Sequence, residues 1–101
     1  MAGRIDLHKV LCWALGSEHV YYQPPESVKM EYPAIVYARS NIENTFADNG
    51  VYAQSHAYEV TVIDRDPDSE VVARVSLLPM CRFNRHYKAD NLNHDVFVLY
   101  Y

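Results

Sequence analysis

The sequence has little glycine, little cysteine and no long hydrophobic run, and each shortage argues against a class of function. Three of its 101 residues are glycine, which is too few for a glycine-rich loop that holds phosphate through backbone N–H groups. The two cysteines, Cys12 and Cys81, lie in apolar surroundings and show no CxxC or Cys/His zinc spacing. We therefore expect two buried free thiols in a reducing compartment.

The apolar run near the N-terminus is short, and Asp6, His8 and Lys9 interrupt it. A bilayer-spanning helix needs about 20 apolar residues, and a signal peptide needs an unbroken apolar core. We therefore expect a soluble, intracellular protein without membrane contact. Nine basic residues against thirteen acidic ones give a net charge of −4. Such a chain is a poor candidate for holding DNA or RNA through phosphate neutralisation.

The sequence is rich in hydrophobic residues and in tyrosine. Half of the chain is hydrophobic, so we expect one folded domain over residues 1–101. Nine tyrosines stand against one tryptophan and three phenylalanines. Tyrosine is enriched where protein surfaces meet, but it is also favoured on the faces of β-sheets. Both interpretations are open at the level of sequence.

Hydrophobic periodicity predicts an α+β fold. The expected elements are helices at 5–16 and 67–78, strands at 33–39, 52–64, 81–88 and 94–101, and a short strand or connector at 19–22. Gly16 is the expected C-cap of the first helix. The turn-rich segment 40–50 is predicted to be an exposed loop or a hairpin arm. The order of elements favours an antiparallel or mixed sheet of about four to five strands, with both helices packed on one face.

Four acids alternate in the segment 64–70, and they raise the question of a metal site. Read as a calcium-binding EF-hand loop, the segment lacks the required glycine and the bidentate glutamate, because Ser69 and Val75 occupy those positions. A helix start explains the acids better. Asp66 is the predicted N-cap and Pro67 the first helical residue. We therefore predict no metal site.

The sequence gives no positive sign of catalysis. None of the five histidines forms an HExxH motif or a close pair, and no serine lies in a GxSxG elbow. We predict no catalytic residue and no cofactor. The rival interpretation is a small enzyme or metal-binding protein that uses His56, His86 and the acids.

Strand 81–88 invites an interpretation as a binding surface. Regular alternation would point Arg82, His86 and Lys88 to the same side, with Asn84 among them. Such a polar face could contact an acidic neighbour. It could equally be a solvated sheet face whose opposite side packs inward.

Five stretches of the chain resemble a family of small proteins from long-tailed bacteriophages and prophages. They are YPAIVY at 32–37, FADN at 46–49, VIDRDPDSE at 62–70, LPMCRFNRHY at 78–87 and DNLNHDVFVLYY at 90–101. The likeness covers residues 31–101. The family is that of tail terminator proteins, also called tail completion or minor capsid proteins.

This resemblance implies structural work in the virion neck. It implies a homohexameric ring that caps the tail tube, docks it to the head-closure or connector protein, and lets DNA pass through the lumen without sequence-specific binding. The protein would assemble in the cytoplasm of the bacterial host. The expected interface residues are Phe46, Asp48, Asn49, Tyr52, Arg82, His86, Lys88 and Tyr101. The alternatives are a head-closure or adaptor subunit of the connector, and a monomeric adaptor that binds a peptide along its sheet edge.

Overall fold

The computed structural model describes residues 4–24, 29–47 and 50–101. These residues form two helices and five strands. They are α1 (Arg4–Leu15), β1 (Val20–Tyr22), β2 (Ala34–Ala47), β3 (Gly50–Asp64), α2 (Glu70–Ser76), β4 (Cys81–Ala89) and β5 (Leu92–Tyr100). The predicted α+β class is confirmed.

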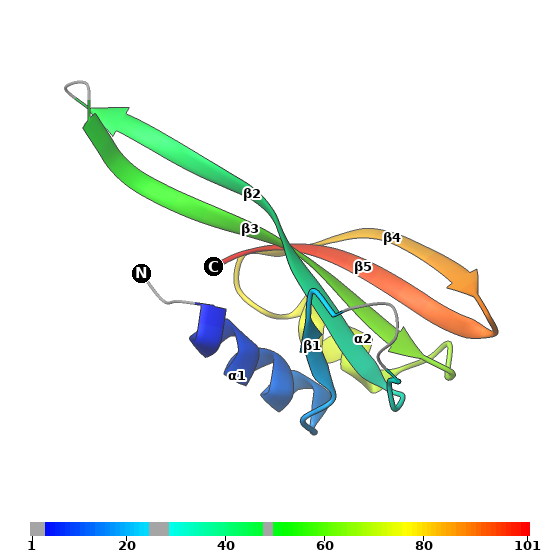
Figure 1. Ribbon diagram of the computed structural model, residues 1–101. Helices are drawn as coiled ribbons and strands as arrows, with labels where there is room; N and C mark the ends of the chain where they lie inside the picture. The colour runs from blue at the N-terminus through cyan, green and yellow to red at the C-terminus, as the bar shows by residue number, and fades with distance from the viewer. Residues whose placement is uncertain (1–3, 25–28, 48–49) are drawn as a thin grey trace.

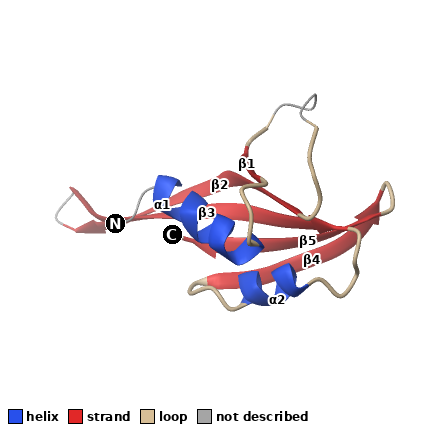
Figure 2. Ribbon diagram, turned by 90° about the horizontal axis from the view of Figure 1, so that it is seen from below, coloured by secondary structure: helices blue, strands red, loops and turns tan. Residues whose placement is uncertain are grey.

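The strands form one mixed sheet in the order β1-β2-β3-β5-β4 (Figure 1). Only the β1–β2 pair is parallel, and the other three pairs are antiparallel. Both helices cover the same face of the sheet (Figure 2). The sheet type and the placement of the helices therefore agree with the sequence prediction.

The hydrophobic core lies between this sheet face and the helices. Strand pairing places Tyr37, Val60 and Phe97 side by side across the three central strands, and all three are fully buried. Leu7 and Leu11 of α1, one turn apart, cover them. The same cluster includes Ala14, Leu15, Val20, Ile35, Tyr58, Val62, Val71, Val75 and Leu99.

Helix α1 ends as the sequence predicts. Gly16 has φ +82°, a conformation that side-chain-bearing residues rarely adopt. Its N–H donates to the carbonyl oxygen of Cys12 at 2.8 Å, which satisfies one of the free carbonyls of the last turn. Gly16 therefore acts as the C-terminal cap.

The predicted start of the second helix is wrong. Helix α2 begins at Glu70, and its N-cap is Ser69, whose hydroxyl accepts the N–H of Val71 at 3.2 Å. The carboxylate of Asp66 instead accepts the N–H of Asp68 at 2.9 Å. Because Asp66 bonds two residues ahead, it closes a turn that precedes the helix.

The described residues of the turn-rich segment 40–50 form part of a hairpin arm. Pairing between β2 and β3 continues from Asn41↔Ala57 to Ala47↔Gly50. The strand predicted at 33–39 therefore extends to Ala47. The residues of this extension have a weak intrinsic preference for strands, and backbone pairing with β3 holds them in the extended conformation. The arm, defined here as residues 41–47 and 50–56, extends well beyond the body (Figure 1). The molecule measures 51 × 26 × 23 Å.

Candidate interaction surfaces

In the acidic segment before α2, side-chain carboxylates bind backbone N–H groups of the same segment. The Asp64 carboxylate accepts the N–H of Asp66 at 3.1 Å, just as Asp66 accepts that of Asp68. In the part of the chain that is described, no group of three or more histidines, cysteines or acids is placed to hold a metal ion. Neither described helix has the length and hydrophobicity needed to cross a membrane.

The structure does not bring His56 and His86 together. His86 pairs with Asp95 on the neighbouring strand, with 2.8 Å between Nδ1 and Oδ1. Asp95 lies beside Val62 of β3, six residues from His56, which is about 20 Å along a strand. The combined site that an enzyme using both histidines would need is therefore not formed.

A β-bulge in β4 corrects the prediction for its basic residues. Register passes from Phe83↔Phe97 to Arg85↔Val96, so Asn84 is an extra residue opposite a single step of β5. The alternation reverses at this point. Arg82 therefore lies on the face away from the helices, while His86 and Lys88 lie on the helix-covered face. The prediction that these three residues point the same way is wrong.

The face of the sheet away from the helices carries an aromatic stack. Tyr87 and His94 lie with ring centroids 4.7 Å apart and planes 9° apart. The guanidinium carbon of Arg85 is 5.6 Å from the Tyr87 centroid. Beside the stack is a shallow hollow, and Met30 from the β1–β2 connection is among the residues that line it. These residues shield part of the face that no helix covers.

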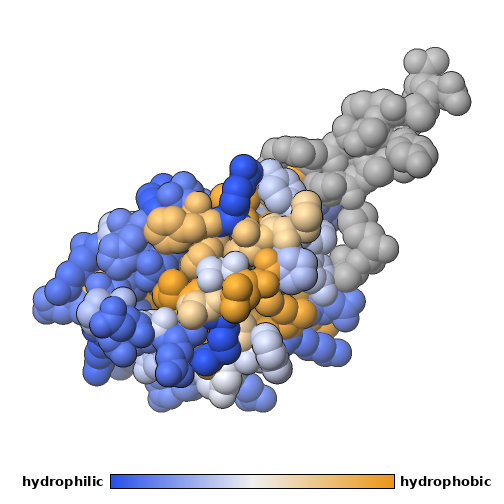
Figure 3. Space-filling view, turned by 180° about the vertical axis from the view of Figure 1, so that it is seen from behind, coloured by the Kyte–Doolittle hydropathy of each residue, from blue (hydrophilic) through white to orange (hydrophobic). Residues whose placement is uncertain are grey.

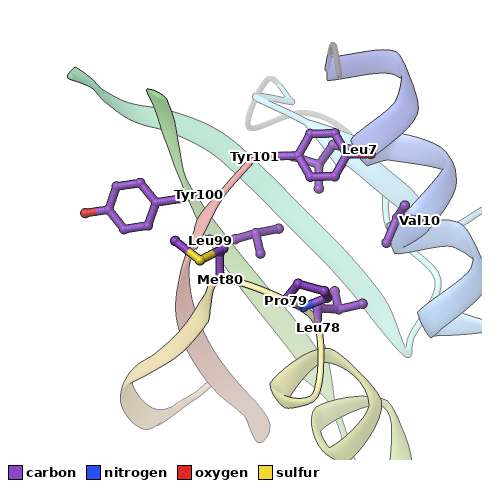
Figure 4. Close-up of a pocket in the computed structure, with 8 residues that line it drawn as sticks. All are labelled: Leu7, Val10, Leu78, Pro79, Met80, Leu99, Tyr100 and Tyr101. Carbon is purple, nitrogen blue, oxygen red and sulfur yellow. The ribbon is translucent and has the colours of Figure 1, made fainter. Parts of the chain in front are cut away.

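An apolar pocket lies where α1, the α2–β4 connection and the C-terminus meet (Figure 4). It has a volume of about 250 Å³ and is lined by Leu7, Val10, Leu78, Pro79, Met80, Leu99, Tyr100 and Tyr101. The ring of Tyr101 turns toward α1, whereas that of Tyr100 turns away (Figure 4). The Tyr101 N–H donates to the carbonyl oxygen of His56 at 3.0 Å, which ties the C-terminal residue to the base of the arm.

Several large apolar side chains are exposed rather than buried. Leu77 is 83% exposed and Met80 71%, and Met80 also borders the pocket. On α1, Trp13 is 70% exposed and Ile5 60%. Figure 3 shows a hydrophobic area on the body seen from behind, with hydrophilic side chains around it. Exposed apolar surface of this kind is typical of contact with other proteins.

Of the expected interface residues on the arm, Phe46 and Tyr52 lie on its two strands near the outer end. Asp48 and Asn49 lie outside the described residues. On β4, Arg82, His86 and Lys88 are all exposed. Tyr101 lies at the apolar pocket. Those of the expected residues that the structure describes thus belong to three separate surfaces rather than to one site.

The remaining polar groups of interest are structural. The buried Tyr37 hydroxyl lies 2.8 Å from Nδ1 of His8 and accepts a hydrogen bond from Nη1 of Arg4 at 3.3 Å. Burial raises the pKa of Tyr37. Both cysteines are free, as expected, but each is half-buried rather than buried. This partial burial raises the pKa of both Cys12 and Cys81, so these thiols stay protonated and weakly nucleophilic at neutral pH.

No protein-family model matches the chain, and no curated protein matches it either. The resemblance to tail terminator proteins therefore remains a hypothesis.

Proposed function

We propose that this chain is a structural subunit of the neck of a long-tailed bacteriophage. In this proposal its copies form a ring that caps the tail tube and docks it to the head connector. DNA passes through the lumen without being read. The proposal combines the sequence resemblance with one structural observation, the two-stranded arm that extends beyond the body.

The arm extends past the ends of the strands that flank β2 and β3 in the body. β1 pairs with β2 only at Ile35–Tyr37, and β5 pairs with β3 from Ala57 onward. Beyond its base, where the Tyr101 N–H donates to the carbonyl oxygen of His56, the described register pairs the two strands of the arm with each other. An isolated two-stranded hairpin is at best marginally stable in water. A subunit that keeps such an arm is suited to placing it on another chain.

The exposed apolar side chains support the same proposal. A ring subunit contacts two neighbours through different surfaces, and a neck subunit also contacts the tube and the connector. Trp13 on α1 and Met80 beside the apolar pocket lie on different elements. Interface cores are enriched in tryptophan, methionine and tyrosine. The chain thus offers several apolar contact points in addition to its arm.

The same features suit a head-closure or adaptor subunit of the connector, so the partner must decide between these roles. The experiment deletes the gene in a phage that encodes the chain. Particles should then accumulate as heads and tails that do not join, and supplying the protein in trans should restore joining. Heads that join to tails of normal length without the chain would refute the proposal. Tails that are abnormally long would favour the terminator role, and tails of normal length that fail to join would favour the adaptor role.

A further inference from the structure

We infer that copies of this chain join by strand addition, with the arm of one copy pairing along the outer edge of β4 in the next copy. This inference rests on the proposed function, because it names the two surfaces through which neighbouring subunits of the ring would meet. It commits to a second copy of the same chain as the partner.

Strand β4 offers an open edge. It is the last strand in the sheet order and, among the described residues, pairs only with β5. Every residue from Arg82 to Lys88 is exposed. The bulge at Asn84 interrupts the edge, but Arg85–Ala89 beyond it is regular. An edge strand with unpaired backbone groups is a template for a strand from another chain.

The distribution of charged residues indicates which strand would pair with the β4 edge. The sequence of β4, residues 81–89, contains three arginines or lysines and no acid. The arm, residues 41–47 and 50–56, contains one acid, Glu43, and no arginine or lysine. Basic residues on an edge oppose pairing with a like edge, and they favour a strand of opposite charge. β4 is therefore protected against pairing with another β4 and suited to the arm.

A single copy cannot make this contact with itself. The arm leaves the body on one side, and the β4–β5 hairpin extends on the opposite side (Figure 1). The arm must therefore reach another molecule. Because the two surfaces differ, each copy both gives an arm and receives one, and such contacts repeat until the rotation between neighbours closes a ring.

Two variants separate the surfaces. In the first, an Asn-Gly turn replaces residues 43–55; it joins Ile42 to His56, which are paired neighbours, through a turn that suits two-residue hairpins. The described core cluster lies entirely outside the removed segment. The second variant carries Arg85→Glu and Lys88→Glu on β4. Lys29→Glu with Arg65→Glu is the matched control, since both residues are exposed and lie outside β4 and the arm.

Light scattering after size exclusion measures the assembly of each protein. We expect the wild type and the control to form the same closed assembly, and each of the two variants alone to be monomeric. Mixed together, the variants should form a one-to-one dimer, because one keeps an intact β4 edge and the other an intact arm. Cooperative thermal unfolding of each variant verifies its fold, and if the armless chain fails this check, the β4 variant and its control carry the test.

Several results would overturn the inference. They are an armless chain or a β4 variant that assembles like the wild type, folded variants that do not form a dimer when mixed, and a wild type that stays monomeric at millimolar concentration. In the first case a ring closed through other surfaces would still be present, so the proposed function would survive. The gene-deletion experiment tests that function independently.

Discussion

The side chain of Arg74 in α2 donates a hydrogen bond from Nε to the main-chain oxygen of Ala14, with 2.6 Å between the two atoms. Ala14 lies in the last turn of α1, where carbonyl groups have no partner within the helix. A cation at this end also meets the negative end of the helix dipole. One side chain therefore joins the two helices that cover the sheet.

Replacing Arg74 with methionine should lower the free energy of unfolding by about 1 kcal/mol. A hydrogen bond to a charged group contributes about 1.5–3 kcal/mol, and partial exposure of this side chain reduces that value. Denaturant unfolding measures the change. Glu70→Ala is the comparison variant, because it removes the exposed 3.7 Å ion pair with Arg74 and the acid of the first turn of α2, while the bond to Ala14 stays in place. An equal loss in both variants would mean that the bond to Ala14 contributes nothing.

Replacing Ser69 with alanine should destabilise the protein by about 1 kcal/mol, because it removes the N-cap of α2. Asp66→Ala should change stability by less than about 0.5 kcal/mol, since Asp66 closes an exposed turn outside the helix. Thermal and denaturant unfolding compare the two variants. The reverse order would restore Asp66 as the cap and contradict the observed start of the helix.

Replacing Tyr37 with phenylalanine should lower stability by about 1 kcal/mol at neutral pH, through loss of the hydrogen bonds to Arg4 and His8. The same variant tests a pH dependence. Burial raises the pKa of Tyr37 in the folded protein, so the folded state holds this proton more tightly than the unfolded chain does. The contribution of this group to the free energy of unfolding is fully present below a pH of about 10, the ordinary tyrosine pKa. It is lost as the pH rises toward the raised pKa of the folded protein.

The unfolding free energies of the wild type and the Tyr37→Phe variant check this dependence. They are measured from about pH 8 upward, which is about two pH units below the ordinary tyrosine pKa. The difference between the two proteins should shrink or reverse above pH of about 10. The other tyrosines cancel in this comparison because both proteins contain them. A difference that stays constant with pH would contradict the raised pKa.

The periodic parts of the fold were predictable, and the parts that depend on local choice or long-range contact were not. Leu7 and Leu11 mark α1 by their spacing, and Gly16 marks its end. Ser69 and Asp66 are both good N-caps, and only the folded backbone shows which one is used. The bulge at Asn84 has no sequence signal. A bulge adds one residue to one strand of a pair, and many residue types can be that extra residue.

The interaction surfaces were predictable only in part. The sequence singled out the arm region and β4 but could not give the arm its length, which follows from backbone pairing between β2 and β3. The bond between Arg74 and Ala14 joins residues 60 positions apart. The apolar pocket likewise gathers α1, the α2–β4 connection and the C-terminus. Such contacts arise from the tertiary fold, so no local sequence pattern predicts them.

The two thiols should react slowly with alkylating reagents in the folded protein. Burial raises the pKa of Cys12 and of Cys81, and the thiolate is the reactive form. At neutral pH both should label much more slowly than in denaturant, and the rate should rise with pH beyond the ordinary thiol pKa of about 8.5. Mass spectrometry follows the labelling, and Cys12→Ser and Cys81→Ser assign each site. Rapid labelling of the native protein at neutral pH would contradict this.

Replacing the exposed Leu77 and Met80 with glutamine should affect assembly rather than folding. Both side chains are largely solvated in the single subunit, so the free energy of unfolding should change by less than about 0.5 kcal/mol each. If this surface contacts a neighbouring subunit, the tube or the connector, the substitutions remove apolar contacts and leave polar groups to be desolvated. Head–tail joining in a phage that carries the variant should then fall. The control is Lys29→Gln, an exposed substitution on the β1–β2 connection, where joining should be unchanged. Normal joining by the Leu77 and Met80 variant would exclude this surface from the neck contacts and leave the arm and β4 as the surfaces that carry the proposed assembly.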